Sequence, residues 1–403
     1  MKYRTKWAHT LLIGALAVGT GSLSVKAQSL EDLNIQIHGY ATQGFLYSSA
    51  NNIFTTNSSN GSPAWTEAVV NVTAQPEPKL RVGVQARYFM LGNLGNAITL
   101  DWASADYKVN DKFGVRFGKV KTPIGLFNEI QDIDPGFIWV FLPQSVYPLE
   151  SRNSLLTHEG GVVYGTLKLG STLGKLEYRG FGGDRMLAGN DGYFLYMMEE
   201  GLDLPNGISG VTFGGALRWK TPIPGLMIGA SDEKDEKWSA PAASSYSVQG
   251  VSIPLTGTFT INPLNNYNFF GQYEKNKIML AAEYNRLPAT VPIILSSSVT
   301  GSIPSVDKTD QRNWYAMVSY KVSKKLTAGV YDSQQFDHQS SLGPSRYQKD
   351  WATTVRYDFN SFLYAKAEEH FVEGTSLNID PLMNPNGTTT NFKLTALKIC
   401  VSF

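Results

Sequence analysis

The stretch 350-DWATTVRYDF-359 alternates two kinds of side chain along its whole length. The two alternating sets are Trp351, Thr353, Val355, Tyr357 and Phe359 on one side and Asp350, Ala352, Thr354, Arg356 and Asp358 on the other. Neighbouring side chains of a β-strand point to opposite faces. The stretch therefore predicts a strand with one apolar, aromatic face and one mixed, charged face.

The same period of two recurs along the chain, and helical periodicity is almost absent. In 312–322 it places Trp314 and Tyr320 on the apolar face, and in 277–286 it places Tyr284 there. We expect about sixteen strands, most of them near the length that a tilted strand needs to cross a bilayer. The expected ranges are 33–48, 65–75, 78–90, 97–109, 112–120, 159–170, 173–183, 210–220, 225–234, 267–275, 277–286, 312–322, 325–336, 348–359, 361–372 and 391–403.

The connections between these ranges alternate in length. The short ones lie at 75–77, 110–111, 171–172, 221–224, 275–276, 323–324 and 360–361. The long ones lie at 49–64, 121–158, 184–209, 235–266, 287–311, 337–347 and 373–390. Only 91–96 breaks the rule, and 246–262 is a candidate hairpin arm inside a loop. Short periplasmic turns and long external loops are typical of an up-and-down transmembrane antiparallel β-barrel, whereas a soluble β-sandwich has no reason to alternate.

Aromatic residues gather at both ends of the apolar faces. Near the short turns or the C-terminus these are Trp219, Tyr320, Tyr357, Phe359 and Phe403. Near the long connections they are Tyr88, Tyr284, Trp314 and Trp351. Two aromatic belts are expected of a barrel that crosses a membrane.

Composition narrows the classes of protein without deciding among them. Charged residues make up 17% of the chain and aromatic residues 12%, which fits a membrane barrel and also a large soluble all-β protein. The formal net charge of +1 gives no basic excess for nucleic acid. The single Cys400 forms no internal disulfide, so an exported chain of this kind would rely on a closed, hydrogen-bonded barrel.

The N-terminal residues have the pattern of an export signal. Lys2, Arg4 and Lys6 precede a short apolar run at 11–18, and Ala27 ends a small-x-small cleavage site. We expect a signal peptide at 1–27 and a barrel domain at 28–403; an uncleaved N-terminal anchor is the weaker alternative. At the other end, an alternating strand closes on Phe403, which resembles the signal read by the machinery that folds barrels into the outer membrane, although a β-protein can end this way by chance.

Two blocks resemble the phosphate-selective porin family and its trimeric sixteen-stranded relatives. The first is 101–129, DWASADYKVNDKFGVRFGKVKTPIGLFNE, whose matching residues are Asp106, Tyr107, Gly114, Arg116, Gly118, Lys119, Lys121, Thr122, Pro123 and Gly125. The second is 362–374, FLYAKAEEHFVEG. The resemblance implies a porin fold, a homotrimer, and a loop after the fifth strand folded into the lumen.

The loop itself departs from that family. Phosphate selectivity there relies on arginines in the constricting loop, whereas 123–157 carries four acidic residues and one arginine. These are Glu129, Asp132, Asp134, Glu150 and Arg152. An acidic loop repels phosphate, so we do not expect phosphate specificity.

The polar faces of the strands and the acidic loop supply candidate pore-lining residues. The set is Arg81, Arg87, Arg116, Lys119, Lys121, Glu129, Asp132, Asp134, Arg179, Arg218, Arg356, Lys366, Glu368 and His370. A basic wall facing an acidic loop would set a transverse field across a constriction, which sorts polar solutes by charge and dipole. The alternative is that these charges pair with each other and fill a narrow barrel.

The aromatic and apolar residues of the loop have two candidate uses. Residues such as Phe127, Trp139 and Phe141 could anchor the loop to the wall or stack a sugar ring, and we favour anchoring.

Catalysis, metals and cofactors find little support. His158 precedes Glu159 and Asp337 precedes His338, but neighbours on a strand diverge, so no catalytic residues are proposed. The acidic stretch 231–236 could hold calcium or bridge to lipopolysaccharide, although a solvated external loop is the preferred interpretation. No metal site, nucleotide motif or cofactor is expected.

The sequence thus predicts an outer-membrane channel for passive diffusion of small hydrophilic solutes or ions, not an enzyme. A substrate-preferring channel for sugars or dicarboxylates is the first alternative, and an outer-membrane enzyme or adhesin is the second. The expected partners are outer-membrane lipid, lipopolysaccharide, the solutes and further copies of the chain, without nucleic acid.

Overall fold

The computed structural model describes residues 33–403 except 190, 200, 262, 298, 300, 378, 380 and 381, so the expected signal peptide lies outside the described residues. The described strands form one 17-stranded antiparallel sheet, of which sixteen close into a barrel and β10 stands outside the wall. The wall strands are β1 (Gln36–Ser48), β2 (Ser62–Glu77), β3 (Leu80–Leu91), β4 (Leu94–Asn110), β5 (Phe113–Lys121), β6 (Thr157–Lys168), β7 (Lys175–Leu187), β8 (Ile208–Lys220), β9 (Leu226–Val248), β11 (Leu264–Lys275), β12 (Ile278–Ser297), β13 (Gly301–Lys321), β14 (Leu326–Asp337), β15 (Tyr347–Asp358), β16 (Leu363–Gly374) and β17 (Asn391–Ser402).

In the part of the chain that the structure describes, the named helices are short segments in the connections. These are η2 (Ser58–Asn60), η3 (Asn128–Ile130), η4 (Asp134–Gly136), α1 (Arg152–Leu156), α2 (Tyr193–Glu199) and η5 (Gly343–Arg346). Among the described residues, none of these helices has the length and apolar character needed to cross a membrane.

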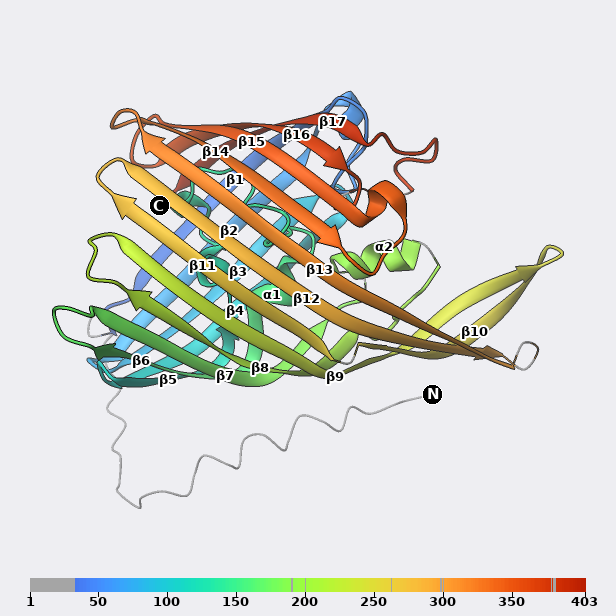
Figure 1. Ribbon diagram of the computed structural model, residues 1–403, viewed down its shortest axis with the longest axis horizontal. Helices are drawn as coiled ribbons and strands as arrows, with labels where there is room; N and C mark the ends of the chain where they lie inside the picture. Colours follow the sequence, from blue (N-terminus) through green and yellow to red (C-terminus); the bar gives the residue numbers. More distant parts are fainter. Residues whose placement is uncertain are drawn as a thin grey trace, which may run out of the picture.

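The barrel closes because β1 pairs with both β2 and β17 (Figure 1). On the β17 side, Tyr40 lies opposite Ser402 and Ser48 opposite Leu394. Closure pairs the backbone groups of the wall strands on both sides, which removes the open sheet edge that an unclosed sheet would present.

The wall has its apolar residues outside and its polar residues inside. On β15, Trp351 is 54% exposed and Val355 45%, whereas Asp350 and Thr354 are buried. On the neighbouring β16 the buried positions include Lys366, Glu368 and His370, and Phe371 on the other face is exposed. The alternation read from the sequence is therefore confirmed, and the charged face is the inner one.

The aromatic residues at the ends of the apolar faces are also on the outside. Large exposed fractions are found for Trp219, Tyr320, Tyr357, Phe359, Phe403, Tyr284 and Trp351. Tyr88 and Trp314 are half-buried. Most residues predicted for the two belts thus lie on the outer surface of the barrel.

The connections follow the predicted alternation in most places. The turn between β3 and β4 is short, as the sequence indicated for 91–96. Two long loops were predicted wrongly, because 235–266 and 287–311 are largely β-structure. There β9, β12 and β13 run on past the rim, and 251–261 forms β10, which pairs with 238–248 of β9 and confirms the hairpin arm. Figure 1 shows the two hairpins projecting from the barrel.

These projecting arms were misread because their proline and serine content is typical of loops. Residues 238–263 and 287–306 contain no charged side chain. Strand pairing needs only backbone groups, and the β-branched residues between the prolines favour an extended chain. Twenty register pairs accordingly join β12 and β13 without a break, from Ile278 opposite Tyr320 to Ser297 opposite Gly301.

Candidate functional site

The connection between β5 and β6, residues 122–156, contacts the inward-facing side chains of the wall, and we call it the inner loop. Its contacts reach strands far apart in the sequence. Val140 N and Phe141 N donate to Glu368 of β16 at 3.0 and 3.1 Å. Tyr147 Oη donates to Glu283 of β12 at 2.6 Å. The loop therefore crosses the interior of the barrel, as the family resemblance implied.

Asp134 is held at one side of the interior by two lysines. Its carboxylate lies 3.1 Å from Lys366 Nζ and 2.5 Å from Lys398 Nζ, and Tyr364 Oη donates to it at 2.7 Å. Burial alone would raise the pKa of Asp134, but Lys366, Lys398 and the hydrogen bond from Tyr364 together outweigh burial and hold that pKa well below its usual range. Asp134 is therefore a charged anchor and not a free acid.

Lys398 connects this anchor to a second buried ion pair. Its Nζ lies 3.7 Å from Glu67, and Glu67 pairs with Arg87 at 2.6 Å. Glu67 and Arg87 are both buried. The predicted wall residue Arg87 is thus neutralised by a neighbour on β2.

The next acidic residue of the loop, Asp132, also has a direct basic partner. Lys121 Nζ lies 2.7 Å from Asp132, and Gln85 donates to Asp132 at 2.8 Å and to Asp101 at 3.0 Å. Arg152, the single arginine of the loop, forms two hydrogen bonds with Asp101, at 3.0 and 2.8 Å. These contacts tie both limbs of the inner loop to β3 and β4.

Glu129 faces three arginines from three strands. Its carboxylate lies 3.2 Å from Arg179, 3.5 Å from Arg218 and 4.0 Å from Arg116. Arg116 also pairs with Asp106 at 2.8 Å. This group is the most open of the ion-pair groups that the loop carboxylates form, since each of the arginine side chains is 15–29% exposed.

Further wall residues hold the backbone of the loop. Arg356 donates to the carbonyl oxygens of Pro135 and Phe137 at 2.6 and 2.9 Å. Glu368, which accepts from the loop amides, also pairs with His370 at 3.0 Å, and His370 contacts Asp350 at 2.9 Å. Glu368 thus anchors the loop, and the buried His370 holds Glu368 in place.

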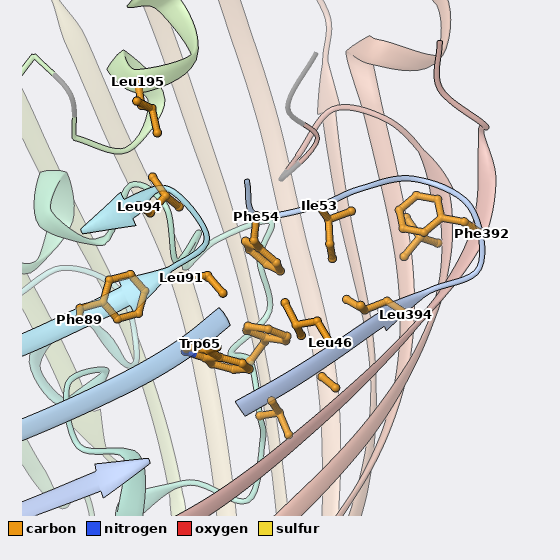
Figure 2. Close-up of a cluster of buried hydrophobic side chains, with 14 residues drawn as sticks. Leu46, Ile53, Phe54, Trp65, Phe89, Leu91, Leu94, Leu195, Phe392 and Leu394 are labelled. Carbon is orange, nitrogen blue, oxygen red and sulfur yellow. The ribbon is translucent and has the colours of Figure 1, made fainter. Parts of the chain in front are cut away.

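Apolar packing fixes the loop as well, which confirms the anchoring role expected for its aromatic residues. Trp139 packs edge to face on Tyr331 at 5.2 Å, and Phe127 stacks on Tyr315 at 6.2 Å. Phe141 stacks on Trp65 at 4.8 Å. Figure 2 shows the cluster around Trp65, in which side chains of the barrel strands meet Ile53 and Phe54 of the first long connection.

Two of the predicted lining residues lie apart from these groups. Arg81 is exposed near the β2–β3 turn, where it donates to Thr73 at 3.4 Å. Lys119 donates to the carbonyl of Leu100 at 2.7 Å. The other predicted residues have the inner-loop or wall contacts described above.

The opposition of an acidic loop to a basic wall takes the form of contact pairs. Asp132, Asp134 and Glu129 each lie within 4.0 Å of at least one cation. Opposite charges attract most strongly where water is excluded, which favours contact over separation across open water. The electric field that the sequence predicted across a constriction is therefore confined to the individual ion pairs.

The acidic stretch 231–236 is also placed differently from its predicted position in a solvated loop. It lies within β9, and Glu233 and Asp235 are buried beside Arg185, at 3.1 and 3.7 Å. The described residues contain no group of three or more His, Cys, Asp or Glu side chains that could hold a metal ion. His158 is buried and Glu159 exposed, so the two diverge as predicted.

Several residues that hold the loop, either by direct contact or through Lys398 and His370, were not singled out from the sequence. These are Glu67, Asp101, Glu283, Asp350, Tyr364 and Lys398. Strand parity carried a signal for some of them, because Lys398 shares a face with Leu394, Ala396 and Cys400, all buried.

Comparison with known proteins identifies the fold. No family model and no curated protein sequence matches this chain. Among solved structures it is similar to OmpF of Salmonella typhi in complex with daunomycin, with a TM-score of 0.57, 13% identity, and 93% of this chain and 99% of that one covered. It is similar to the anion-selective porin of Comamonas acidovorans, with a TM-score of 0.53, 9% identity, and 92% of this chain and 99% of that one covered. It is also similar to the outer membrane channel DcaP of Acinetobacter baumannii, with a TM-score of 0.52, 10% identity, and 93% of this chain and 99% of that one covered.

The Comamonas protein is thus a porin and the Acinetobacter protein an outer membrane channel. Identities this low establish a common fold and no more.

Proposed function

We propose that this chain is an outer-membrane porin that passes small hydrophilic solutes or ions by diffusion. The observation that carries the proposal is the inside-out barrel, with exposed apolar and aromatic residues outside and buried charged residues inside. A closed barrel satisfies its backbone hydrogen bonds internally, which a bilayer demands. Similarity to an anion-selective porin and to an outer membrane channel supports the proposal.

Its surroundings follow from the same proposal. The apolar belt would face outer-membrane lipid, the rim would meet lipopolysaccharide, and the protein would assemble as a homotrimer, as the family resemblance implies. A channel that prefers one solute class is the first alternative. Phosphate is not the solute we favour, since the inner loop is acidic.

Stepwise conductance tests the proposal directly. Purified full-length protein added to a planar lipid bilayer should insert and give discrete current steps. Preparations that are folded, as judged by heat-modifiable migration on a gel, but that never conduct would contradict the porin and favour an enzyme or adhesin.

Membrane embedding predicts a depth-dependent cost for charge on the outer face. Val318 is exposed between Ala316 and Tyr320 of β13, and Val322 follows the end of the same strand. Val318→Arg should lower the free energy of unfolding by about 2–4 kcal/mol, and Val322→Arg by only about 0–1 kcal/mol. Urea unfolding in phospholipid vesicles measures both. Equal losses would argue against a bilayer around the barrel.

Ion selectivity should depend on the carboxylates of the inner loop. The double variant Glu129→Gln with Asp132→Asn removes two negative charges, which frees positive charge on Arg179, Arg218 and Lys121. Reversal potentials measured under a salt gradient give the ratio of anion to cation permeability, and this ratio should rise several-fold. Asp111→Asn with Glu373→Gln, both exposed pairs, is the matched control. An unchanged reversal potential would mean that the loop does not line the path.

A further inference from the structure

The group around Glu129 has the composition of an anion site that is already filled. Three guanidinium groups reach one carboxylate from β5, β7 and β8. Two other carboxylates lie at the edge of this group. Asp106 pairs with Arg116. Glu177 lies 3.7 Å from Arg179 and also pairs with Lys220. Four cations thus meet three carboxylates, and without Glu129 the excess becomes two positive charges.

Donor capacity remains in this group even with Glu129 in place. Arg179 Nη1 and Arg218 Nε are buried nitrogens that make no hydrogen bond within the described structure. A buried donor without a partner costs free energy, which a ligand oxygen would recover. Arg218 is also fixed in position, since it donates to the carbonyl of Gly125 at 3.0 Å.

Of the loop carboxylates Glu129, Asp132 and Asp134, Glu129 is the most loosely held. Its side chain is 18% exposed, against 0% for Asp132 and 9% for Asp134. Its nearest cation is at 3.2 Å, whereas Asp132 and Asp134 have cations at 2.7 and 2.5 Å. A carboxylate that is more distant from its partners and closer to water is the easiest to displace.

We propose that Arg116, Arg179 and Arg218 form a carboxylate-binding subsite, and that Glu129 is its tethered occupant, displaced when a solute carboxylate enters. This inference rests on the proposed channel function and names its solute class, small organic carboxylates. The guanidinium forks match a planar two-oxygen group. One carboxylate replaces another, so the exchange is nearly balanced and binding stays weak enough for release into the channel.

A carboxylate fits the site better than phosphate does. In the observed arrangement one oxygen of Glu129 faces Arg179 and Arg218 and the other faces Arg116, which is a two-oxygen pattern. Asp106 and Glu177 at the edge would repel the second charge of a phosphate dianion held at the same point.

Block of chloride current by succinate tests the proposal. Glu129 competes at an effective concentration in the millimolar range, as expected for a short tether, so Glu129→Gln should lower the half-blocking succinate concentration on the order of tenfold. Arg179→Lys in the Glu129→Gln background keeps the charge but loses the fork, and should reverse most of that gain. Asp111→Asn, exposed in the β4–β5 turn, should leave the block as in the unmodified protein.

The remaining outcomes are distinguishable. If folded channels conduct but Glu129→Gln leaves succinate block unchanged, the subsite is overturned and the porin stands. If Glu129→Gln strengthens block by inorganic phosphate, at a charge matched to succinate, as much as it strengthens block by succinate, the assignment to carboxylates is overturned. If no variant conducts, the channel function itself fails. Heat-modifiable migration for each variant separates these results from misfolding.

Discussion

Replacing Asp134 by alanine is expected to destabilise the folded barrel by about 3–5 kcal/mol, because it removes the carboxylate that Lys366 and Lys398 share and leaves Lys398 with Glu67 at 3.7 Å. Lys366 and Lys398 are 2% and 5% exposed, and Asp134 is the carboxylate that both contact within 3.1 Å. The ammonium groups would have to lose their protons, admit water or push the loop away. The temperature of the heat-modifiable transition should fall, and the channel current should become noisier as the loop is released.

A compensating variant separates loss of charge balance from loss of packing. Asp134→Ala combined with Lys366→Met and Lys398→Met removes both cations together with their shared carboxylate, while Glu67 keeps Arg87 at 2.6 Å. This variant should recover much of the stability, since replacing a buried ionic group by apolar residues is often neutral. Asp111→Ala, an exposed acid, should change little. A wild-type transition temperature for Asp134→Ala alone would show that the lysines find other partners.

The same anchor predicts how docking of the loop depends on pH. Since the pKa of Asp134 is lowered in the folded state, its contribution is fully present above the ordinary carboxyl pKa. It is lost as pH falls toward the depressed value. Acid should therefore weaken docking, and Asp134→Asn should remove that part of the acid sensitivity.

The strands were predictable from the sequence because their signal is local. Alternation in 350–359 fixes which side chains face in, and β15 (Tyr347–Asp358) has that pattern in the structure. A strand between polar and apolar surroundings must sort its side chains at every second position, so neighbours in the sequence suffice. The arms at 238–261 and 287–310 lacked this contrast and were read as loops.

The partners inside the barrel were much harder to predict. Asp134 and Lys398 are 264 positions apart, and their meeting depends on the register of every strand between them. The sequence identified the acidic loop and many of the basic wall residues as separate sets. It could not indicate that they would touch, because that depends on how far the loop penetrates the barrel.

Replacing Arg152 by alanine is the second change with a large expected effect. Arg152 and Asp101 are 3% and 4% exposed and share two hydrogen bonds. Burial would lower the pKa of Arg152, but Asp101, Asp132 and Glu67 together raise that pKa by more, so the guanidinium stays charged. Arg152→Ala should cost about 3–5 kcal/mol, since Asp101 then keeps only the neutral donor Gln85 among these partners.

Lysine at the same position tests geometry against charge. Arg152→Lys retains the positive charge but offers a point donor in place of the planar fork, so its loss should lie between those of the wild type and Arg152→Ala. Arg152→Ala with Asp101→Ala removes both charges and should be less destabilised than Arg152→Ala alone. Urea unfolding in vesicles measures the series. If Arg152→Lys and Arg152→Ala lose equal stability, the fork is essential and charge alone contributes nothing; if neither loses any, the return limb of the inner loop is held by its apolar contacts.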